Sequence, residues 1–308
     1  MSDLNFYIAY YSCVEARQRL LYLLKRTIAS ARREKVDNLY VLDGSEQQSM
    51  LKPSEVDAEI IRNEKHSLAC ATNIAIEHAE HLMFVSVHSV VLGVGLIRNM
   101  LIEKEAAEKQ LDRSVALCPG LASYPTCDKW FQSLPEHDVG KGKWVQDIKQ
   151  ELYNVGFSFT EDGIAISKEP RIDWTKGEIL YGRGLGAGYL VDKDRLFEMG
   201  GADERCWCID YDNGLRWWSF GWPIISSQSV KWHRLIHSTY RGCTRRYDEV
   251  KDTFYAHKKY DKALYQLYLH HQYKPIDENP SFYRDNLVSP YQEEYDRLKK
   301  KPFFLGRE

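Results

Sequence analysis

Long apolar runs, excess charge of one sign and phosphate-binding motifs are missing from this sequence of 308 residues. No run approaches the roughly 20 apolar residues that span a bilayer, and the N-terminus has no basic-then-apolar signal peptide. A formal net charge of -2 gives no overall field that would favour nucleic acid. No Walker motif is present. We therefore expect a soluble, cytoplasmic protein without a membrane span.

Cysteine pairs at metal-binding spacing are also missing. The seven cysteines include no CxxC pair, and Cys206 and Cys208 stand too close together for most zinc sites. Their number is odd, and they are scattered over a long chain. We predict that they are reduced thiols, as is usual in a cytosolic protein.

Aromatic residues, in contrast, are abundant, because they make up 13% of the chain with 20 Tyr and 8 Trp. Composition alone favours an aromatic-rich core, and the functional alternative is a flat platform on which a sugar or a base stacks. The length is sufficient for one large α/β domain or two small ones with a full core.

Strand and helix patterns alternate through the first 120 residues. Short β-branched and aromatic runs predict strands at 6–11, 39–42, 82–87 and 115–118. Apolar residues at helical spacing predict helices at 15–33, 53–64, 69–80 and 90–109. This order is typical of a doubly wound α/β half with a parallel sheet.

Asp43-Gly44-Ser45 follows directly after the second of these strands. Ligands of open α/β sheets bind at the carboxyl ends of the strands, where a carboxylate accepts a hydrogen bond from a base or a ribose hydroxyl. The alternative is a plain turn, since Asp-Gly is common in turns.

The second half is organised around a stretch that runs from a glycine-rich segment to His233. Gly186 and Gly188 lie in that segment, where glycine lets a backbone approach a ligand closely, although a flexible turn is an equal alternative. A short helix at 192–199 and strands at 189–191, 223–225 and 230–233 are predicted around it. A hairpin is predicted within 154–166, around Asp162-Gly163.

The order of these elements resembles the family 2 glycosyltransferases and their relatives with the GT-A fold, over about residues 5–240. Asp43-Gly44-Ser45 and Thr72-Asn73 are similar to motifs of the family's first half. Gly200-Gly201-Ala202-Asp203-Glu204 resembles its Gly-Gly-Phe-Asp-Glu segment. The family pattern Glu-Asp-x-Asp-Leu-x-x-Arg, followed by Gly, is matched here by Asp210, Asp212, Arg216 and Gly221. Two positions depart from it, because Ile209 replaces the usual Glu and Asn213 replaces the usual Leu.

The resemblance implies a Rossmann-like GT-A fold, with a central, mostly parallel mixed sheet flanked by helices. It places a glycosyltransferase domain at 1–240, with a nucleotide-binding half at 1–120 and an acceptor half at 177–240. Residues 241–308 would then be a helical C-terminal extension.

The chain departs from the family at the metal-binding DxD motif. The corresponding place reads Val85-Ser86-Val87-His88-Ser89, and no Asp or Glu occurs from Leu82 to Asn99. Mg²⁺ and Mn²⁺ prefer oxygen ligands. The resemblance therefore implies a diphosphate held without a conventional metal, a metal bound with help from His88 and His233, or a lost activity.

The activity implied by the resemblance is transfer of a sugar from a UDP-sugar or other NDP-sugar to a hydroxyl acceptor such as a glycan. Asp210 would be the general base of an inverting reaction, and Asp212 would orient the acceptor or cap the next helix. The alternatives are that both carboxylates cap the helix through Arg216, and that the reaction is retaining. Acceptor contacts fall on Gly186, Gly188 and Trp207. Donor contacts fall on Tyr10, Tyr11, Ser12, Asp43, Asn73, Ser86, His88 and Arg241.

Two other functions remain open on the sequence alone. One is a nucleotide-sugar-binding protein without catalysis, which the missing DxD motif supports. The other is a glycosyltransferase acting on nucleic acid, supported by the aromatics and by Arg241, Arg245 and Arg246. A homodimer is also left open.

Overall fold

The structure is a computed structural model that describes residues 4–65, 67–92, 95–123, 157–159, 165–167, 185, 188–204, 212–214, 216–217 and 220–234. The expectation of a helical extension at 241–308 lies outside these residues.

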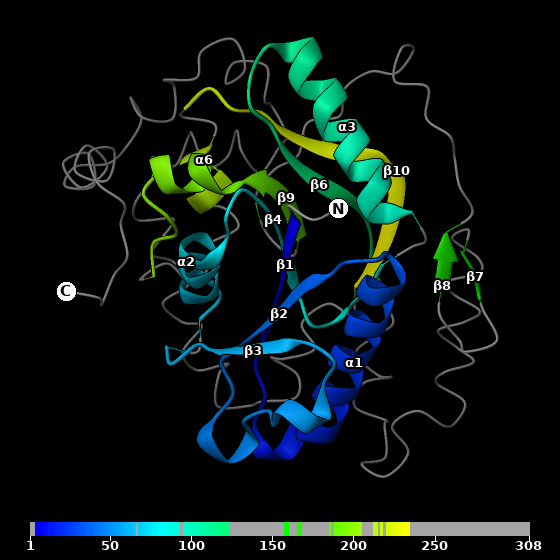
Figure 1. Ribbon diagram of the computed structural model, residues 1–308, viewed down its shortest axis with the longest axis vertical. Coiled ribbons are helices and arrows are strands. Elements are labelled where there is room, and N and C mark those ends of the chain that lie inside the picture. Colours follow the sequence, from blue (N-terminus) through cyan, green and yellow to red (C-terminus); the bar gives the residue numbers. More distant parts are fainter. Residues whose placement is uncertain are drawn as a thin grey trace.

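One mixed sheet of eight strands dominates the described part of the chain, in the order β3-β2-β1-β4-β9-β6-β10-β5 (Figure 1). The strands β3, β2, β1 and β4 are mutually parallel. Strand β9 lies antiparallel between β4 and β6, β10 is parallel to β6, and β5 is antiparallel to β10. Their bounds are β1 (Leu4–Tyr10), β2 (Asn38–Asp43), β3 (Glu59–Arg62), β4 (Leu82–Val87), β5 (Val90–Val91), β6 (Ala116–Ser123), β9 (Gly188–Asp192) and β10 (Ile224–Arg234).

Helices cover both faces of this sheet. Along β1 the side chains alternate, so Phe6 and Ile8 pack with residues of α1 and α3, whereas Tyr7 packs with residues of α2 and α6. The result is a three-layer α/β/α arrangement, which Figure 1 shows with α2 and α6 apart from α1 and α3. The bounds are α1 (Arg17–Arg33), α2 (Leu68–His78), α3 (Leu96–Leu111) and α6 (Lys193–Glu198), with 3₁₀ turns η1 (Val14–Ala16), η2 (Gln47–Ser49) and η3 (Pro53–Glu55).

The predicted fold class is confirmed, and so is the hairpin, which forms from β7 (Phe157–Phe159) and β8 (Ala165–Ser167). The helix predicted at 53–64 is wrong. The chain makes only η3 and then β3, which extends the sheet at the edge of β2. Residues Ile60 and Ile61 are β-branched, which favours a strand, and they pair with Val41 and Leu42.

Two further boundaries differ from the predictions. The helix expected at 90–109 is preceded by β5, and α3 begins only after Gly95, whose φ of 77° suits glycine. The two strands expected at 223–225 and 230–233 are one strand, β10, with a register irregularity between Ser226 and Lys231.

The prediction that all cysteines are reduced is wrong at Cys13. This residue is buried and disulfide-bonded, and its partner lies outside the described residues, while Cys70 and Cys118 are free. A disulfide is more usual in an oxidising environment than in the cytosol, so the cysteines give no support to a cytoplasmic location. Among the helices that the structure describes, none has the length and apolar character to cross a membrane.

Candidate active site

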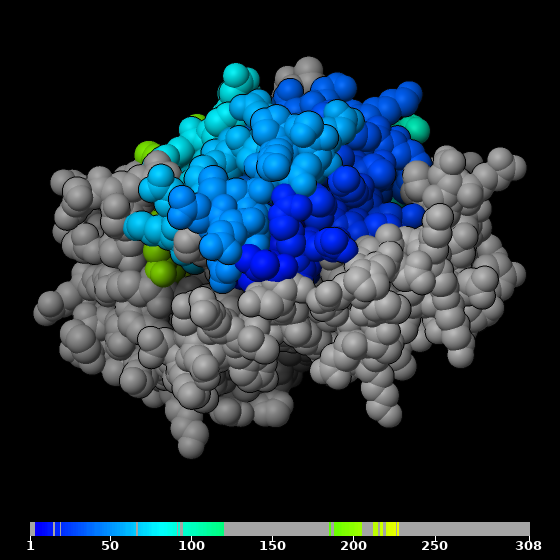
Figure 2. All heavy atoms as spheres, turned by 90° about the horizontal axis from the view of Figure 1, so that it is seen from below, coloured from blue at the N-terminus to red at the C-terminus, as the bar shows by residue number. Residues whose placement is uncertain are grey.

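The carboxyl ends of four parallel strands meet at one edge of the sheet. Asp43, the last residue of β2, pairs in register with Tyr10 of β1 and with Arg62 of β3. Ala9 pairs with Val87, the last residue of β4, and accepts a hydrogen bond from the His88 backbone. The segments that follow β1 and β2 adjoin on the face viewed in Figure 2, where they carry the blue colours. This edge is where the sequence predicted the donor site.

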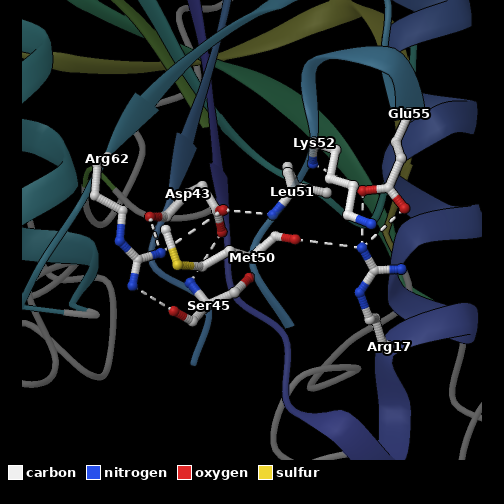
Figure 3. Close-up of polar contacts among 8 residues, drawn as sticks. All are labelled: Arg17, Asp43, Ser45, Met50, Leu51, Lys52, Glu55 and Arg62. Carbon is white, nitrogen blue, oxygen red and sulfur yellow. Dashed lines mark hydrogen bonds and ion pairs between the residues drawn. The ribbon is translucent and has the colours of Figure 1, made fainter. Parts of the chain in front are cut away.

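Asp43 organises the loop that leaves β2. The residue is 1% exposed, and its two carboxylate oxygens accept hydrogen bonds from the Ser45 N–H at 2.9 Å and the Leu51 N–H at 2.9 Å (Figure 3). A carboxylate offers about four acceptor positions, so these two N–H groups do not exhaust it. Asp43 thus fixes the loop at the predicted base site.

Arg62 lies beside Asp43 and was not predicted. Its guanidinium donates to the Asp43 carbonyl at 3.0 Å and to the Ser45 carbonyl at 2.6 Å, and it lies 3.7 Å from the Asp43 carboxylate (Figure 3). Arg62 was missed because the segment 53–64 was assigned to a helix. The adjacent β-branched residues Ile60 and Ile61 were a weak signal for a strand.

A second ion pair holds the far end of the same loop against α1. Both oxygens of Glu55 accept from Arg17, at 2.8 and 2.7 Å, and one also accepts from the Lys52 N–H at 2.8 Å (Figure 3). Burial alone would raise the pKa of Glu55, but the hydrogen bonds from Arg17 and the Lys52 backbone outweigh it and lower the pKa. The loop 44–55 is therefore fixed at both ends, by Asp43 and by Glu55.

The residues that end β1 are largely committed to the fold. Tyr10 is buried, and burial is the main cause that raises the pKa of its hydroxyl, so the group stays neutral. The Tyr11 hydroxyl donates to the Glu46 carboxylate at 3.3 Å. Ser12 is buried, with its hydroxyl 3.3 Å from the Cys13 carbonyl. The three residues border the loop 44–55.

The end of β4 offers little to a hard metal ion. Ser86 is buried and hydrogen-bonds locally to the Val87 carbonyl, and the His88 imidazole lies 3.3 Å from the Ala9 carbonyl and edge-on to Tyr10. In the residues described, no group of three or more His, Cys, Asp or Glu side chains is placed to hold a metal. The residues present at this end do not fit a Mg²⁺ or Mn²⁺ site of oxygen ligands.

Asn73 connects the two halves of the fold. It is fully buried in α2, and its amide makes a reciprocal pair with the backbone of Ala202, accepting from the Ala202 N–H at 2.7 Å and donating to the Ala202 carbonyl at 3.0 Å. The same Nδ2 donates to the Glu204 carboxylate at 2.9 Å. The contacts of Asn73 are thus to the second half of the chain rather than to the edge where β1 and β2 end.

Asp212 and Arg216 form a buried pair on the other side of that segment. Arg216 donates to the Asp212 carboxylate at 2.9 Å, to the Asn213 side chain at 3.0 Å and to the Met199 carbonyl at 3.2 Å. The Asp212 and Arg216 side chains are 0% and 1% exposed. Asp212 is therefore held inside the protein by a cation one helical turn away.

Of the remaining predicted site residues, some are placed by their backbone alone and the others lie outside the described residues. Gly188 is the first residue of β9 and pairs with Ser86, and the backbone of His233 lies in β10 opposite Val91. Trp217 and Trp222 are buried and in edge contact, with ring centroids 5.0 Å apart. Outside the described residues lie Gly186, Trp207, Asp210 and Arg241.

Comparisons with known proteins identify the fold. No family model matches the sequence, and no curated protein matches it. Among solved structures, GalNAc-T7 with UDP, GalNAc and Mn²⁺ is similar, with 13% identity, a TM-score of 0.50, and coverage of 98% of this chain and 55% of that chain. The chain thus spans about half the length of GalNAc-T7.

Two other structures are more distant. The mannosyltransferase PcManGT from Pyrobaculum calidifontis, in complex with GDP-Man and Mn²⁺, has 12% identity, a TM-score of 0.47, and coverage of 96% of this chain and 73% of that chain. The 1–349 segment of S. aureus TarS has 9% identity, a TM-score of 0.44, and coverage of 96% and 69%. The likeness to GalNAc-T7, together with the strand order, confirms the GT-A fold that the sequence predicted.

Proposed function

We propose that this chain is a glycosyltransferase that moves a sugar from a nucleotide-sugar donor to a hydroxyl acceptor, with inversion at the sugar. The observation that supports the proposal is the meeting of Tyr10, Asp43 and the end of β4 at one edge of a GT-A sheet. Ligands of open α/β sheets bind at this edge. Fold alone does not fix chemistry, so the residues at the site must support the assignment.

The donor nucleotide would bind against the loop 44–55. Asp43, which is 1% exposed and whose carboxylate holds the Ser45 and Leu51 N–H groups, is the proposed acceptor for a base N–H or a ribose hydroxyl. Arg62 stabilises the loop by holding the carbonyls of Asp43 and Ser45. Tyr10, Tyr11 and Ser12, at and after the end of β1, and Ser86 and His88, at and after the end of β4, are the other proposed donor contacts.

In the reaction proposed, the acceptor hydroxyl attacks the anomeric carbon while the bond from that carbon to the nucleoside diphosphate breaks. Asp210 takes the proton of the attacking hydroxyl, and the leaving diphosphate carries away the bonding electron pair. A carboxylate at that place also stabilises positive charge that develops on the sugar ring. Asp212, paired with Arg216, would position this segment, and Gly186, Gly188 and Trp207 would contact the acceptor.

The proposed handling of the diphosphate does not depend on a DxD motif. Cationic side chains such as Arg241 would bind it through bidentate contacts. The alternative is a divalent ion bound with help from His88 and His233. GalNAc-T7 was solved with Mn²⁺, so both arrangements are to be tested.

A thermal-shift panel tests the donor assignment. The protein would be melted with UDP-GlcNAc, UDP-GalNAc, GDP-mannose and the free nucleotides, each with and without Mn²⁺. A donor present at 100 times its Kd is expected to stabilise the fold by about 2.7 kcal/mol, which raises the Tm by several degrees. If every nucleotide sugar leaves the Tm unchanged under both conditions, the proposal fails.

The missing metal ligands favour a second candidate, a protein that binds nucleotide sugars without transferring them. Such a protein would be stabilised by a donor in the same panel but would release no nucleoside diphosphate with any acceptor. Turnover therefore separates the two functions.

A further inference from the structure

The segment Met199–Glu204 is held from two sides by buried polar groups. On one side, Asn73 of α2 binds both backbone groups of Ala202. On the other, Arg216 binds the Met199 carbonyl. Between these contacts the chain turns through Gly200 and Gly201, with φ values of 90° and 76° that favour glycine. The turn therefore has one conformation fixed by groups outside it.

The contacts of Asn73 are directional, and they use both N–H donors of its amide. Its Oδ1 accepts from the Ala202 N–H, which assigns the amide orientation, and its Nδ2 then donates to the Ala202 carbonyl and the Glu204 carboxylate. The second Glu204 oxygen lies 2.8 Å from the Lys65 ammonium. Since Asn73, Ala202 and the Glu204 side chain are 0%, 0% and 5% exposed, water competes little for these bonds.

These contacts anchor both ends of the segment that contains Asp210. Residues 205–211 separate Glu204 from Asp212. Glu204 is fixed by Asn73 and Lys65, and Asp212 is fixed by Arg216. All of these partners belong to α2, to the residues just before it, or to the helical turn around Arg216.

We propose that Asn73 is a positioning residue for the segment that contains Asp210, and not a contact to the donor. This inference rests on the proposed function for its effect on turnover. It replaces the donor role that the sequence predicted for Asn73, because both ends of its amide are already engaged by Ala202 and Glu204.

Asn73→Asp tests the inference with a nearly isosteric change. The substitution keeps an oxygen that accepts from the Ala202 N–H. The Nδ2 donor of Asn73, however, is replaced by a second oxygen, which faces the Ala202 carbonyl and the Glu204 carboxylate. Turnover at saturating donor is expected to fall by about 10- to 100-fold, the scale that a displacement of about 1 Å produces. The Kd of the donor, measured with UDP-GlcNAc, UDP-GalNAc or GDP-mannose, should stay within about twofold, since the contacts of Asn73 do not reach the donor edge.

Two further variants and a control sharpen the result. In the double variant Asn73→Asp with Glu204→Gln, the new amide at position 204 can donate to the new carboxylate at position 73. Part of the lost turnover should therefore return. Glu204→Ala removes the contacts to Asn73 and Lys65 while Asn73 keeps both bonds to Ala202, and should lower turnover even if Asn73→Asp does not fold. Thr72→Val is the matched control, because Thr72 is the neighbouring buried residue of α2 and hydrogen-bonds Tyr189 in β9 at 3.3 Å. It should leave turnover unchanged.

Hydrogen exchange gives a readout that does not depend on activity. In Asn73→Ala, which removes the acceptor of the Ala202 N–H, the Ala202 amide should exchange faster than in the wild type, while the amides of β1 keep their protection. Unchanged exchange at Ala202, or a weakened donor Kd with unchanged turnover, would overturn the inference. If the wild type turns over no nucleotide sugar, the proposed function fails, and the exchange measurement still decides whether Asn73 holds this segment.

Discussion

Arg216 carries its charge inside the protein, with 1% of its surface exposed. The cost of burying it is offset by hydrogen bonds to Asp212, Asn213 and the Met199 carbonyl. The residue came from the sequence only as a match to a family pattern. Its contacts give that match a physical reason, since they hold the turn that precedes the proposed base.

Removing the charge of Arg216 should be strongly destabilising. Arg216→Met leaves the Asp212 carboxylate buried beside an apolar side chain, which is expected to lower the free energy of unfolding by about 3–5 kcal/mol. Urea unfolding at pH 7 measures this change. Lys193→Met is the control, because the Lys193 side chain pairs, among the described residues, with an exposed Asp194 at 3.7 Å, and the change should alter stability by about 0.5 kcal/mol or less. A loss below about 1 kcal/mol for Arg216→Met would contradict the account of the buried pair.

Single residues were predicted where a motif is local, and missed where it is not. Asp43 was found because a carboxylate after a strand is visible in three consecutive letters. The place of Asn73 was found, but its partners were not, because Ala202 lies 129 residues away in the sequence. The ion pair between Lys65 and Glu204, which are 139 residues apart, had no signal in the sequence.

The loop 44–55 is the element that joins the proposed donor site to α1. Its fixed ends depend on Asp43 at one side and on the Arg17–Glu55 pair at the other. The Arg17 and Glu55 side chains are 24% and 20% exposed, so solvent screens the pair in part.

The stability that the Arg17–Glu55 pair contributes should depend on pH. The pKa of Glu55 is lowered in the folded protein, so its contribution is present above the unfolded pKa and is lost as the pH falls through the folded pKa. Glu55→Gln is therefore expected to lower the free energy of unfolding by about 0.5–1 kcal/mol at pH 7, and by less as the solution is made acidic. Urea titrations across this range measure the difference. A difference that is constant or grows toward acid pH would show that the charge of Glu55 is not the source.

At the level of elements, the sequence predicts the long periodic segments well and the short ones poorly. The strand at 82–87 was predicted with the bounds of β4, and the helix patterns of α1 and α2 are clear. The segment 53–64 was assigned to a helix because its strand, β3, is only four residues long and follows a 3₁₀ turn that begins with Pro53. Pairing with β2, which is not visible in the local sequence, decides its conformation.

The fold as a whole was more predictable than the site. Order and spacing of strands and helices predicted a doubly wound α/β half, since parallel strands require crossover helices, and the resemblance to the family 2 glycosyltransferases implied the GT-A arrangement. The metal question was also visible in the sequence, as a stretch without Asp or Glu at the end of β4. What local patterns do not contain is the connection between the halves, where α2 and the turn at Gly200 and Gly201 are joined by side-chain hydrogen bonds.

The central claim is that the protein transfers a sugar with Asp210 as the base. The direct measurement is release of nucleoside diphosphate from the nucleotide sugar that most raises the Tm, by the wild type and by Asp210→Asn, in the presence of glycan acceptors. The account predicts release by the wild type, and a loss of about 100-fold or more in the variant with the donor-induced Tm shift retained. Equal release by the two proteins, or none by the wild type, would contradict it.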